Sequence, residues 1–181
     1  MTKASFKEKL RSKKATAGIT LGARIALLSA IALLVVVLDQ VSKAWMRLVL
    51  VRGDLPLIPG VLRLSLVENT GAAFSIGQGA TWLFIATAMG IIFCAYLWVI
   101  NDKNLPLSIV VSLGVICGGG AGNLIDRLVR GSVTDFFATE FIKFPIFNVA
   151  DIAISLGIFV AFILIWRYDR RDDQRCDRTT K

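Results

Sequence analysis

Apolar residues along this chain gather in four long runs that are separated by shorter polar segments. The runs cover about residues 24–42, 80–100, 105–125 and 146–166. A helix needs about 20 mostly apolar residues to cross roughly 30 Å of hydrocarbon, so each run predicts one membrane-spanning helix. We therefore expect an all-α integral membrane protein in which residues 21–168 form a single domain of four transmembrane helices. A basic extension at residues 1–20 and a polar tail at residues 169–181 would flank it.

A different pattern appears between the first two runs. Pro56 and the Pro59-Gly60 pair mark turns, and the segment Leu62-Arg63-Leu64-Ser65-Leu66 then alternates apolar with polar residues. Alternation with a period of two is typical of a strand with one apolar face. We expect a small extracytoplasmic β-sheet within residues 43–79, resting on the membrane surface. The other outer segment, residues 126–145, is expected to hold a short polar loop that contains Asp135.

The distribution of Lys and Arg predicts the orientation of the helices. The residues through Arg24, the loop at 101–106 and the tail after Trp166 hold 14 of them, whereas the segments on the other side hold 7. Cytoplasmic loops carry the excess of positive charge in membrane proteins. We therefore expect both termini in the cytoplasm and the segments 43–79 and 126–145 on the outer, periplasmic side.

Composition excludes several functions. Hydrophobic residues make up 55% of the chain, the mean hydropathy is +0.67 and the net charge is +8. The basic residues lie mainly beside the spans, where attraction to anionic lipid explains them, so we expect membrane lipids and no nucleic acid as partners. The chain has no His, and its cysteines are Cys94, Cys117 and Cys176, which excludes His-dependent triads and usual zinc sites and offers no pair placed for a disulfide. Hydrolytic chemistry would have to come from carboxylates, a Ser/Lys pair or an oxygen-ligated metal.

Asp151 is a candidate functional residue because of its depth. It lies about one and a half turns inside an apolar stretch from Phe144 to Trp166. An ionisable residue within a span costs about 3 kcal/mol on insertion scales and usually faces a bundle interior at a working site. Asn148 and Ser155 share its helical stripe, at i−3 and i+4. We expect the Asn to hold the Asp carboxyl by hydrogen bonding where water is scarce.

Further polar residues lie near the outer ends of two other spans. Asn123, Asp126 and Arg127 follow a run of glycines, which favours close helix packing, and they share a face if the helix continues. An interfacial salt-bridge and capping cluster is the alternative interpretation. Asp39 and Lys43 stand at i, i+4 in the acid-then-base order that favours an ion pair, so a structural role is the preferred interpretation for them.

Paired carboxylates predict one particular chemistry. Two Asp side chains close together do not both ionise easily, so one stays protonated while the other acts as a base toward water, as in aspartic proteases. Such a dyad titrates as a coupled pair. Asp151 is one expected partner, and the pattern leaves open which other acid completes the pair: Glu68, Asp126, Asp135 or Glu140.

Two other functions fit some of these features. A small proton-coupled carrier or channel component would also place acids within spans. Against it, the acids cluster at one membrane face and no inverted repeat is evident. A protease that uses Ser42 and Lys43 fails on geometry, because adjacent residues of a helix point about 100° apart.

Five short motifs match a known family in order. They are Asp39-Gln-Val-Ser-Lys43, Asn69-Thr-Gly-Ala-Ala-Phe74, Gly122-Asn123-Leu-Ile-Asp126-Arg127, Val133-Thr-Asp135-Phe-Phe137 and Phe147-Asn148-Val-Ala-Asp151. Several are weakly specific alone, but jointly they are highly specific. With these motifs the chain resembles bacterial lipoprotein signal peptidase, signal peptidase II, from the first span to the fourth.

The resemblance implies an intramembrane aspartic endopeptidase of the bacterial inner membrane. Such an enzyme removes signal peptides from diacylglyceryl-modified prolipoproteins on the N-terminal side of the lipidated cysteine and is sensitive to globomycin. The resemblance implies Asp135 and Asp151 as the catalytic pair and no metal or organic cofactor, and we expect a monomer. The residues expected to bind substrate or support the site are Asp39, Lys43, Asn69, Gly71, Asn123, Asp126, Arg127 and Asn148. The 55–75 segment is expected to form a cradle over the membrane.

Overall fold

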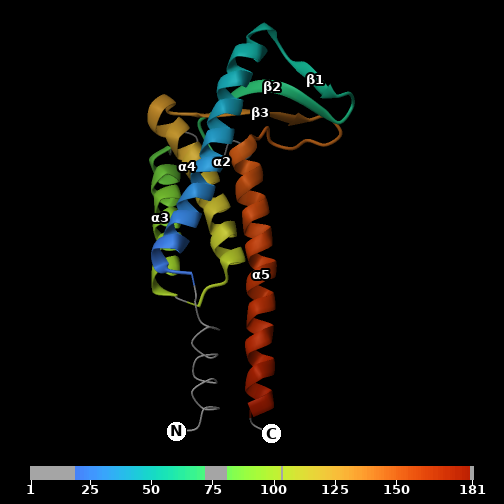
Figure 1. Ribbon diagram of the computed structural model, residues 1–181. Coiled ribbons are helices and arrows are strands. Elements are labelled where there is room, and N and C mark those ends of the chain that lie inside the picture. The colour runs from blue at the N-terminus through green and yellow to red at the C-terminus, as the bar shows by residue number, and fades with distance from the viewer. Residues whose placement is uncertain (1–18, 72–80, 103, 180–181) are drawn as a thin grey trace, which may run out of the picture.

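The computed structural model describes residues 19–71, 81–102 and 104–179. Its helices are α2 (Leu21–Val49), continued by the short 3-10 helix η1 (Leu50–Arg52), α3 (Thr81–Asn101), α4 (Leu107–Arg130) and α5 (Val149–Thr179). Four helices in these residues are long and apolar enough to cross a membrane, which confirms the expected class. The strands lie together at one end of the helices, whereas α2 begins and α5 ends at the opposite end (Figure 1).

Two helices continue beyond the predicted spans at the end nearest the sheet. α2 runs to Val49 and α4 to Arg130, although the apolar runs stop near residues 42 and 125. A helix makes its backbone hydrogen bonds internally, so it does not need apolar side chains in order to continue. α4 ends where Gly131 adopts a left-handed conformation (φ 78°) and its N–H donates to the Arg127 carbonyl at 3.1 Å. The segment 43–79 therefore begins as helix.

The sheet is larger than the sequence pattern indicated. Its strands β1 (Leu55–Ile58), β2 (Leu62–Asn69) and β3 (Val133–Thr139) are antiparallel in the order β1-β2-β3. The predicted sheet after the first helix is confirmed, but the prediction that Asp135 lies in a loop is wrong, because it lies in β3. Residues 133–136 are buried whichever face they point to, so this strand lacks the alternating pattern that marks a half-exposed one.

Helix α4 packs against the other three spanning helices, and against α2 and α5 it does so at positions that have no side chain. A Cβ at Gly118 would lie 2.6 Å from the Ala32 carbonyl oxygen of α2, and one at Gly119 would lie 2.6 Å from the Ala150 carbonyl oxygen of α5. Glycine lets helix backbones approach this closely in lipid. The predicted packing role of the glycine run is therefore confirmed at these positions, and α4 brings its polar residues between α2 and α5.

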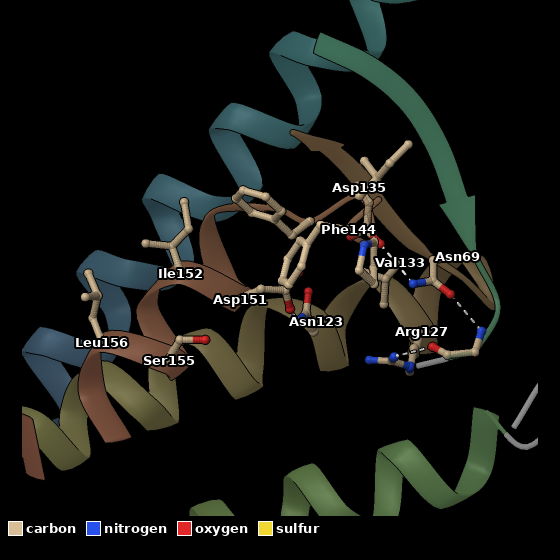
Figure 2. Close-up of a pocket in the computed structure, with 14 residues that line it drawn as sticks. Asn69, Asn123, Arg127, Val133, Asp135, Phe144, Asp151, Ile152, Ser155 and Leu156 are labelled. Atoms are coloured by element: carbon tan, nitrogen blue, oxygen red, sulfur yellow. Dashed lines mark hydrogen bonds between the residues drawn. The ribbon is translucent and has the colours of Figure 1, made fainter. Parts of the chain in front are cut away.

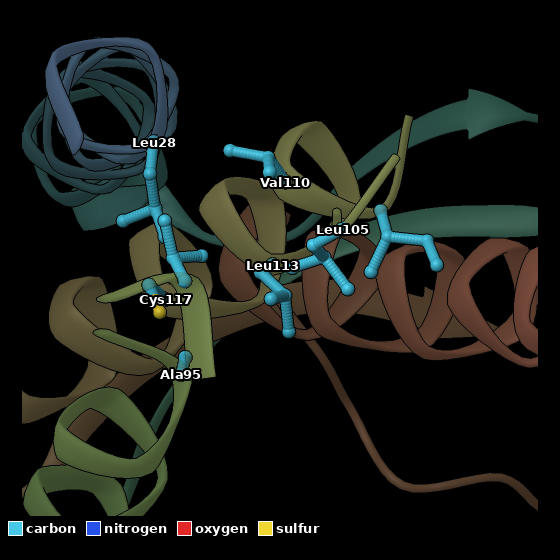
Figure 3. Close-up of a cluster of buried hydrophobic side chains, with 8 residues drawn as sticks. Leu28, Ala95, Leu105, Val110, Leu113 and Cys117 are labelled. Atoms are coloured by element: carbon cyan, nitrogen blue, oxygen red, sulfur yellow. The ribbon is translucent and has the colours of Figure 1, made fainter. Parts of the chain in front are cut away.

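The half of the bundle away from the sheet holds an apolar core. Its buried side chains come from α2, α3, α4 and the segment before α4, namely Leu28, Ala95, Val99, Leu105, Ile109, Val110, Leu113 and Cys117 (Figure 3). Cys117 is thus a packing residue, and it and Cys94 are both free. Buried Arg24 of α2 closes this end by donating to the carbonyls of Asp102 and Leu105 at 3.0 and 2.7 Å.

Candidate active site

A cavity of about 660 Å³ opens where the sheet meets the bundle. β2, α4, β3, the segment before α5 and α5 itself all contribute to its wall (Figure 2). Its polar lining residues are Asn69, Asn123, Arg127, Asp135, Asp151 and Ser155, and Gly71 also lines it. Phe144, Ile152 and Leu156 form an apolar side. A ligand in this cavity would meet both Asp side chains and an apolar wall.

Asp151 lies in the first turn of α5 and not one and a half turns inside a span, as the apolar run had indicated. The helix begins at Val149, because Asn148 forms a reciprocal cap with Asp151. The Asp151 N–H donates to Asn148 Oδ1 at 3.0 Å, and the Asn148 N–H donates to Asp151 Oδ2 at 3.1 Å. Such a pair satisfies two N–H groups that a helix start leaves without partners. The positive end of the helix dipole also favours a carboxylate at this position.

Asp135 accepts from asparagines on two different elements. Asn148 Nδ2 donates to its Oδ1 at 2.6 Å, and Asn69 Nδ2 of β2 donates to its Oδ2 at 2.9 Å. The Asp135 side chain is almost fully buried. Asn148 therefore contacts both acids, through its amide nitrogen to Asp135 and through its backbone and oxygen to Asp151.

Asn123 of α4 links Asp151 and Asn148 to the buried side chain of Lys43. Its Nδ2 donates to Asp151 Oδ1 at 2.8 Å, and its Oδ1 accepts from Lys43 Nζ at 2.9 Å and from Asn148 Nδ2 at 3.1 Å. An ammonium group can only donate, so Lys43 fixes which end of the Asn123 amide faces it. The Asn123 NH₂ group is thereby directed at the Asp151 carboxylate.

Lys43 is fully buried between two acids. Its Nζ lies 2.8 Å from Asp39 Oδ2 and 3.0 Å from Asp126 Oδ2, and all three side chains are at most 1% exposed. Asp39 also accepts from the N–H of Ala150 in α5 at 3.0 Å, and Asp126 accepts from the N–H of Thr134 in β3 at 3.1 Å. The expected Asp39–Lys43 ion pair is present, and this triad connects α2, α4, α5 and β3.

The pKa of Asp135 is raised to about 6, and burial is the largest cause. The neighbouring Asp151 charge also raises this pKa, whereas the hydrogen bonds from Asn69 and Asn148 and the charge of Lys43 oppose the rise. A carboxyl group with this pKa exchanges its proton readily near neutral pH. The cavity thus contains an acid that can be protonated beside a second acid at a helix N-terminus.

Arg127 borders the cavity and a second hollow. Its Nη2 donates to the Gly71 carbonyl at 3.1 Å, and its guanidinium lies 4.9 Å from the centre of the Phe84 ring. Its Nε is buried and has no hydrogen-bond partner among the residues that the structure describes. The second hollow, also about 660 Å³, lies between α3, α4 and α5, and its lining is apolar except at Thr87, Asn123 and Arg127.

The residues expected in the site from the sequence come together in one network. Asp39, Lys43, Asn69, Asn123, Asp126, Asn148 and the two acids Asp135 and Asp151 are joined directly or through one another. Gly71 and Arg127 lie at the rim, bonded to each other. Of the four acids left open as the partner of Asp151, only Asp135 lines the same cavity.

The other three acids have separate contacts. Asp126 is paired with Lys43, Glu140 accepts from the Gly60 N–H at 2.9 Å, and Glu68 accepts from Ser132 and Thr134. Ser42 donates to the Asp39 carbonyl and not to Lys43, so a Ser/Lys pair is absent here. In the described residues no three acidic or cysteine side chains cluster in the way that a metal site needs.

Gln40 and Arg47 belong to the network but were not identified from the sequence. Gln40 Nε2 donates to Asp39, to Asp126 and to the Gly122 carbonyl at 3.1–3.2 Å, and Arg47 donates to Thr134 at 2.8 Å. The spacing of Asp39, Lys43 and Arg47 at i, i+4 and i+8 places them on one helical face. This polar stripe is a signal that could have identified Arg47.

Comparisons with known proteins all point to one family, and the matches cover most of the described chain. The family model described as "Signal peptidase (SPase) II" matches residues 31–167, which include every residue of the network. A "Lipoprotein signal peptidase" of Streptococcus pyogenes serotype M6 is 37% identical over 142 residues, 78% of this chain and 93% of that protein. Another of that name, from Streptococcus agalactiae serotype Ia, is 37% identical over 138 residues, 76% of this chain and 90% of that protein.

Solved structures share the fold. A bacterial membrane enzyme structure obtained by the in meso method at 2.3 Å resolution matches with a TM-score of 0.68 and 30% identity, covering 81% of this chain and 88% of that one. A second structure with the same description, at 1.9 Å resolution, matches with a TM-score of 0.68 and 31% identity, covering 80% and 92%.

Proposed function

Since the chain belongs to the signal peptidase II family, we propose that it is an intramembrane aspartic endopeptidase with Asp135 and Asp151 as its catalytic pair. It cleaves diacylglyceryl-modified prolipoproteins on the N-terminal side of the lipidated cysteine. One observation carries this proposal. The two acids line one cavity and are joined through Asn148, which donates to Asp135 and caps Asp151.

The surroundings of the two acids give each a role. Asp151 accepts from Asn123 and from the Asn148 N–H, and it lies at the positive end of the α5 helix dipole. Asp135 is almost fully buried, and its pKa of about 6 lets it hold a proton near neutral pH. We therefore assign Asp151 as the general base and Asp135 as the acid that starts the reaction protonated.

The proposed reaction needs only these two groups and water. Asp151 takes a proton from water while the water oxygen attacks the scissile carbonyl carbon, and Asp135 gives its proton to the carbonyl oxygen. In the second step the carbon–nitrogen bond breaks and Asp151 returns its proton to the leaving amine. The new carboxyl group gives a proton back to Asp135, which restores the starting state.

Arg127 is suited to hold the substrate backbone. Its buried Nε lacks a hydrogen-bond partner in the described residues, and its guanidinium borders both hollows. A planar group with several fixed donors binds peptide carbonyls in a defined direction. A substrate chain that passes Arg127 can place one apolar part along Ile152 and Leu156 and another in the second hollow, between α3, α4 and α5.

The position of the site fits a substrate anchored by lipid. The acids lie in β3 and in the first turn of α5, and the Lys and Arg distribution favours the outer side of the inner membrane for this end of the helices. A lipid-anchored cysteine would keep the scissile bond near that level. A proton carrier is less well supported, because the opposite half of the bundle is filled by the apolar side chains around Leu113.

The deciding experiment is cleavage of a diacylglyceryl-modified prolipoprotein by purified protein. Asp135→Asn and Asp151→Asn should each lower kcat at least about a thousandfold, within the range expected for loss of acid–base catalysis. Asp54→Asn is a matched control, because Asp54 forms an exposed ion pair with Arg63 away from the cavity. Near-normal turnover by either of the first two variants would refute the dyad. An unlipidated substrate controls for lipid dependence, and inhibition by globomycin is a first check.

A further inference from the structure

Thr134, the residue before Asp135, is fully buried and is held by three other elements. Its N–H donates to Asp126 of α4 at 3.1 Å, and its Oγ1 accepts from Arg47 of α2 at 2.8 Å. The same hydroxyl donates to Glu68 Oε1 of β2 at 3.3 Å. Ser132 donates to the other Glu68 oxygen at 2.6 Å. We name Arg47, Glu68, Ser132 and Thr134 the Thr134 cluster.

The cluster lies on the opposite face of β3 from the catalytic acid. Glu68 pairs with Thr134 across the ladder, and Val67 pairs with Asp135. Successive residues of a strand point to opposite faces, so Glu68, Thr134 and Ser132 share one face while Asn69 and Asp135 share the other. A slip of β3 by one residue would exchange the two faces and separate Asp135 from Asn69.

The backbone ladder alone holds this end of the strand weakly. The β2–β3 register shifts between Leu64 and Val67, and beyond the shift the pairs are Val67–Asp135, Glu68–Thr134 and Asn69–Val133. Register beside such an irregularity depends on side chains and on the buried face. The buried hydroxyl of Thr134 keeps its partners Arg47 and Glu68 only in the observed register.

We propose that Arg47, Glu68 and Thr134 are positioning residues, which fix the register of β3 so that the Asp135 carboxylate meets Asn69 and Asn148. This inference rests on the proposed catalytic role of Asp135. None of the three contacts the cavity, so they act through β3 and not on the substrate.

The pH profile separates positioning from general stability. The charged groups that face Asp135 are Asp151, Lys43 and Arg127, and they are unchanged in variants of the cluster. If Asp135 moves away from Asn69, it loses a donor that favours its ionised form, and its pKa rises. The alkaline limb of kcat/KM then moves to higher pH. A variant that only lowers the amount of folded enzyme leaves the profile in place.

The test compares Thr134→Val and Glu68→Ala with Thr134→Ser, which keeps the hydroxyl. We expect Thr134→Val and Glu68→Ala to lower kcat by about tenfold to a hundredfold with little change in KM, as for a misplaced catalytic group. Both should shift the alkaline limb upward, and Thr134→Ser should restore kcat and the profile. The double variant should lose no more than the worse single one, because the residues act as one unit.

Glu140→Ala is the matched control, since Glu140 bonds Gly60 just beyond the opposite end of the β2–β3 ladder and neither residue lines the cavity. Wild-type kcat and pH profile in both Thr134→Val and Glu68→Ala would overturn the inference, as would equal losses in Glu140→Ala. Glu68 is exposed, so its variant folds even if Thr134→Val does not, and melting temperatures check this. Activity in Asp135→Asn would refute the proposed function instead, so the two failures are distinguishable.

Discussion

Asn148 and Asp151 cap the start of α5 reciprocally, with the backbone N–H of each donating to the side chain of the other at 3.1 and 3.0 Å. The Asn148 side chain also donates to Asp135 at 2.6 Å. One residue thus begins the helix and joins the two acids, so its structural and chemical roles are separable by substitution.

Asn148→Ser and Asn148→Ala should both lose activity to a similar extent, but they should differ from each other in stability. Serine still caps a helix, whereas alanine loses the cap at a cost of about 1 kcal/mol. Neither can donate an amide N–H to Asp135, and loss of such a donor lowers kcat by roughly a hundredfold or more. Thermal unfolding in detergent and kcat measure the two effects. Near-normal turnover by the serine variant would show that the amide is dispensable.

The stability of the protein should depend on the titration of Asp135. Its pKa is about 6 in the folded state, against about 3.9 for an unfolded Asp. Between these values the folded state binds more protons, so the free energy of unfolding falls as pH rises from about 4 to about 6, by about 3 kcal/mol in all. Asp135→Asn lacks this dependence. The difference in unfolding free energy between the two proteins, measured at pH 4 and pH 7, checks it, and a constant difference contradicts it.

Lys43→Met should destabilise the protein strongly. It leaves the buried carboxylates of Asp39 and Asp126 without their cation, which costs about 3–5 kcal/mol for a buried pair. Adding Asp39→Asn removes one of the two charges and should recover part of that loss. Unfolding midpoints of the single and double variants decide the point. A double variant no more stable than Lys43→Met alone would mean that charge is not the cause.

Gly120→Leu should block the second hollow, between α3, α4 and α5, without disturbing the fold. Gly120 lines this hollow, and a Cβ there would meet no described atom within 4 Å. Leucine would fill space that the substrate's apolar part needs, and we expect kcat/KM to fall about tenfold, an overpacking cost near 1.4 kcal/mol. Gly22→Leu, on α2 and equally open, is the control. Unchanged kcat/KM in Gly120→Leu would show that the second hollow does not bind the substrate.

The sequence predicted the spans, and which polar residues lie together, better than it predicted the strand and helix boundaries. Long apolar runs report directly on membrane crossing, so the four helices were found. β3 was missed because Val133 to Phe136 are buried on both faces and pair with a segment far earlier in the chain. The start of α5 was misplaced because Ile146 and Phe147 are apolar but lie outside the helix, before the cap at Asn148.

Other contacts could not be predicted because they join residues that lie far apart in the sequence. Asp39 and Lys43 were expected to pair because they are one turn apart in a helix. Nothing in their local sequence indicates that Lys43 also contacts Asn123 and Asp126 on another helix. The Thr134 cluster likewise joins pairs of residues that are 66 and 87 positions apart in the sequence, and only the folded chain brings them together.

The dependence of the site on α5 has a consequence for biosynthesis. Asp151, Asn148 and the N–H that binds Asp39 all belong to the start of the last helix, whereas Asp135 belongs to a strand that pairs with β2. A chain still emerging from the ribosome has three spans inserted but only half of its acid pair in position. If Asp135 and Asp151 are the catalytic pair, as proposed, proteolytic competence arises only when the final helix has docked, and a chain truncated before residue 148 would be inert.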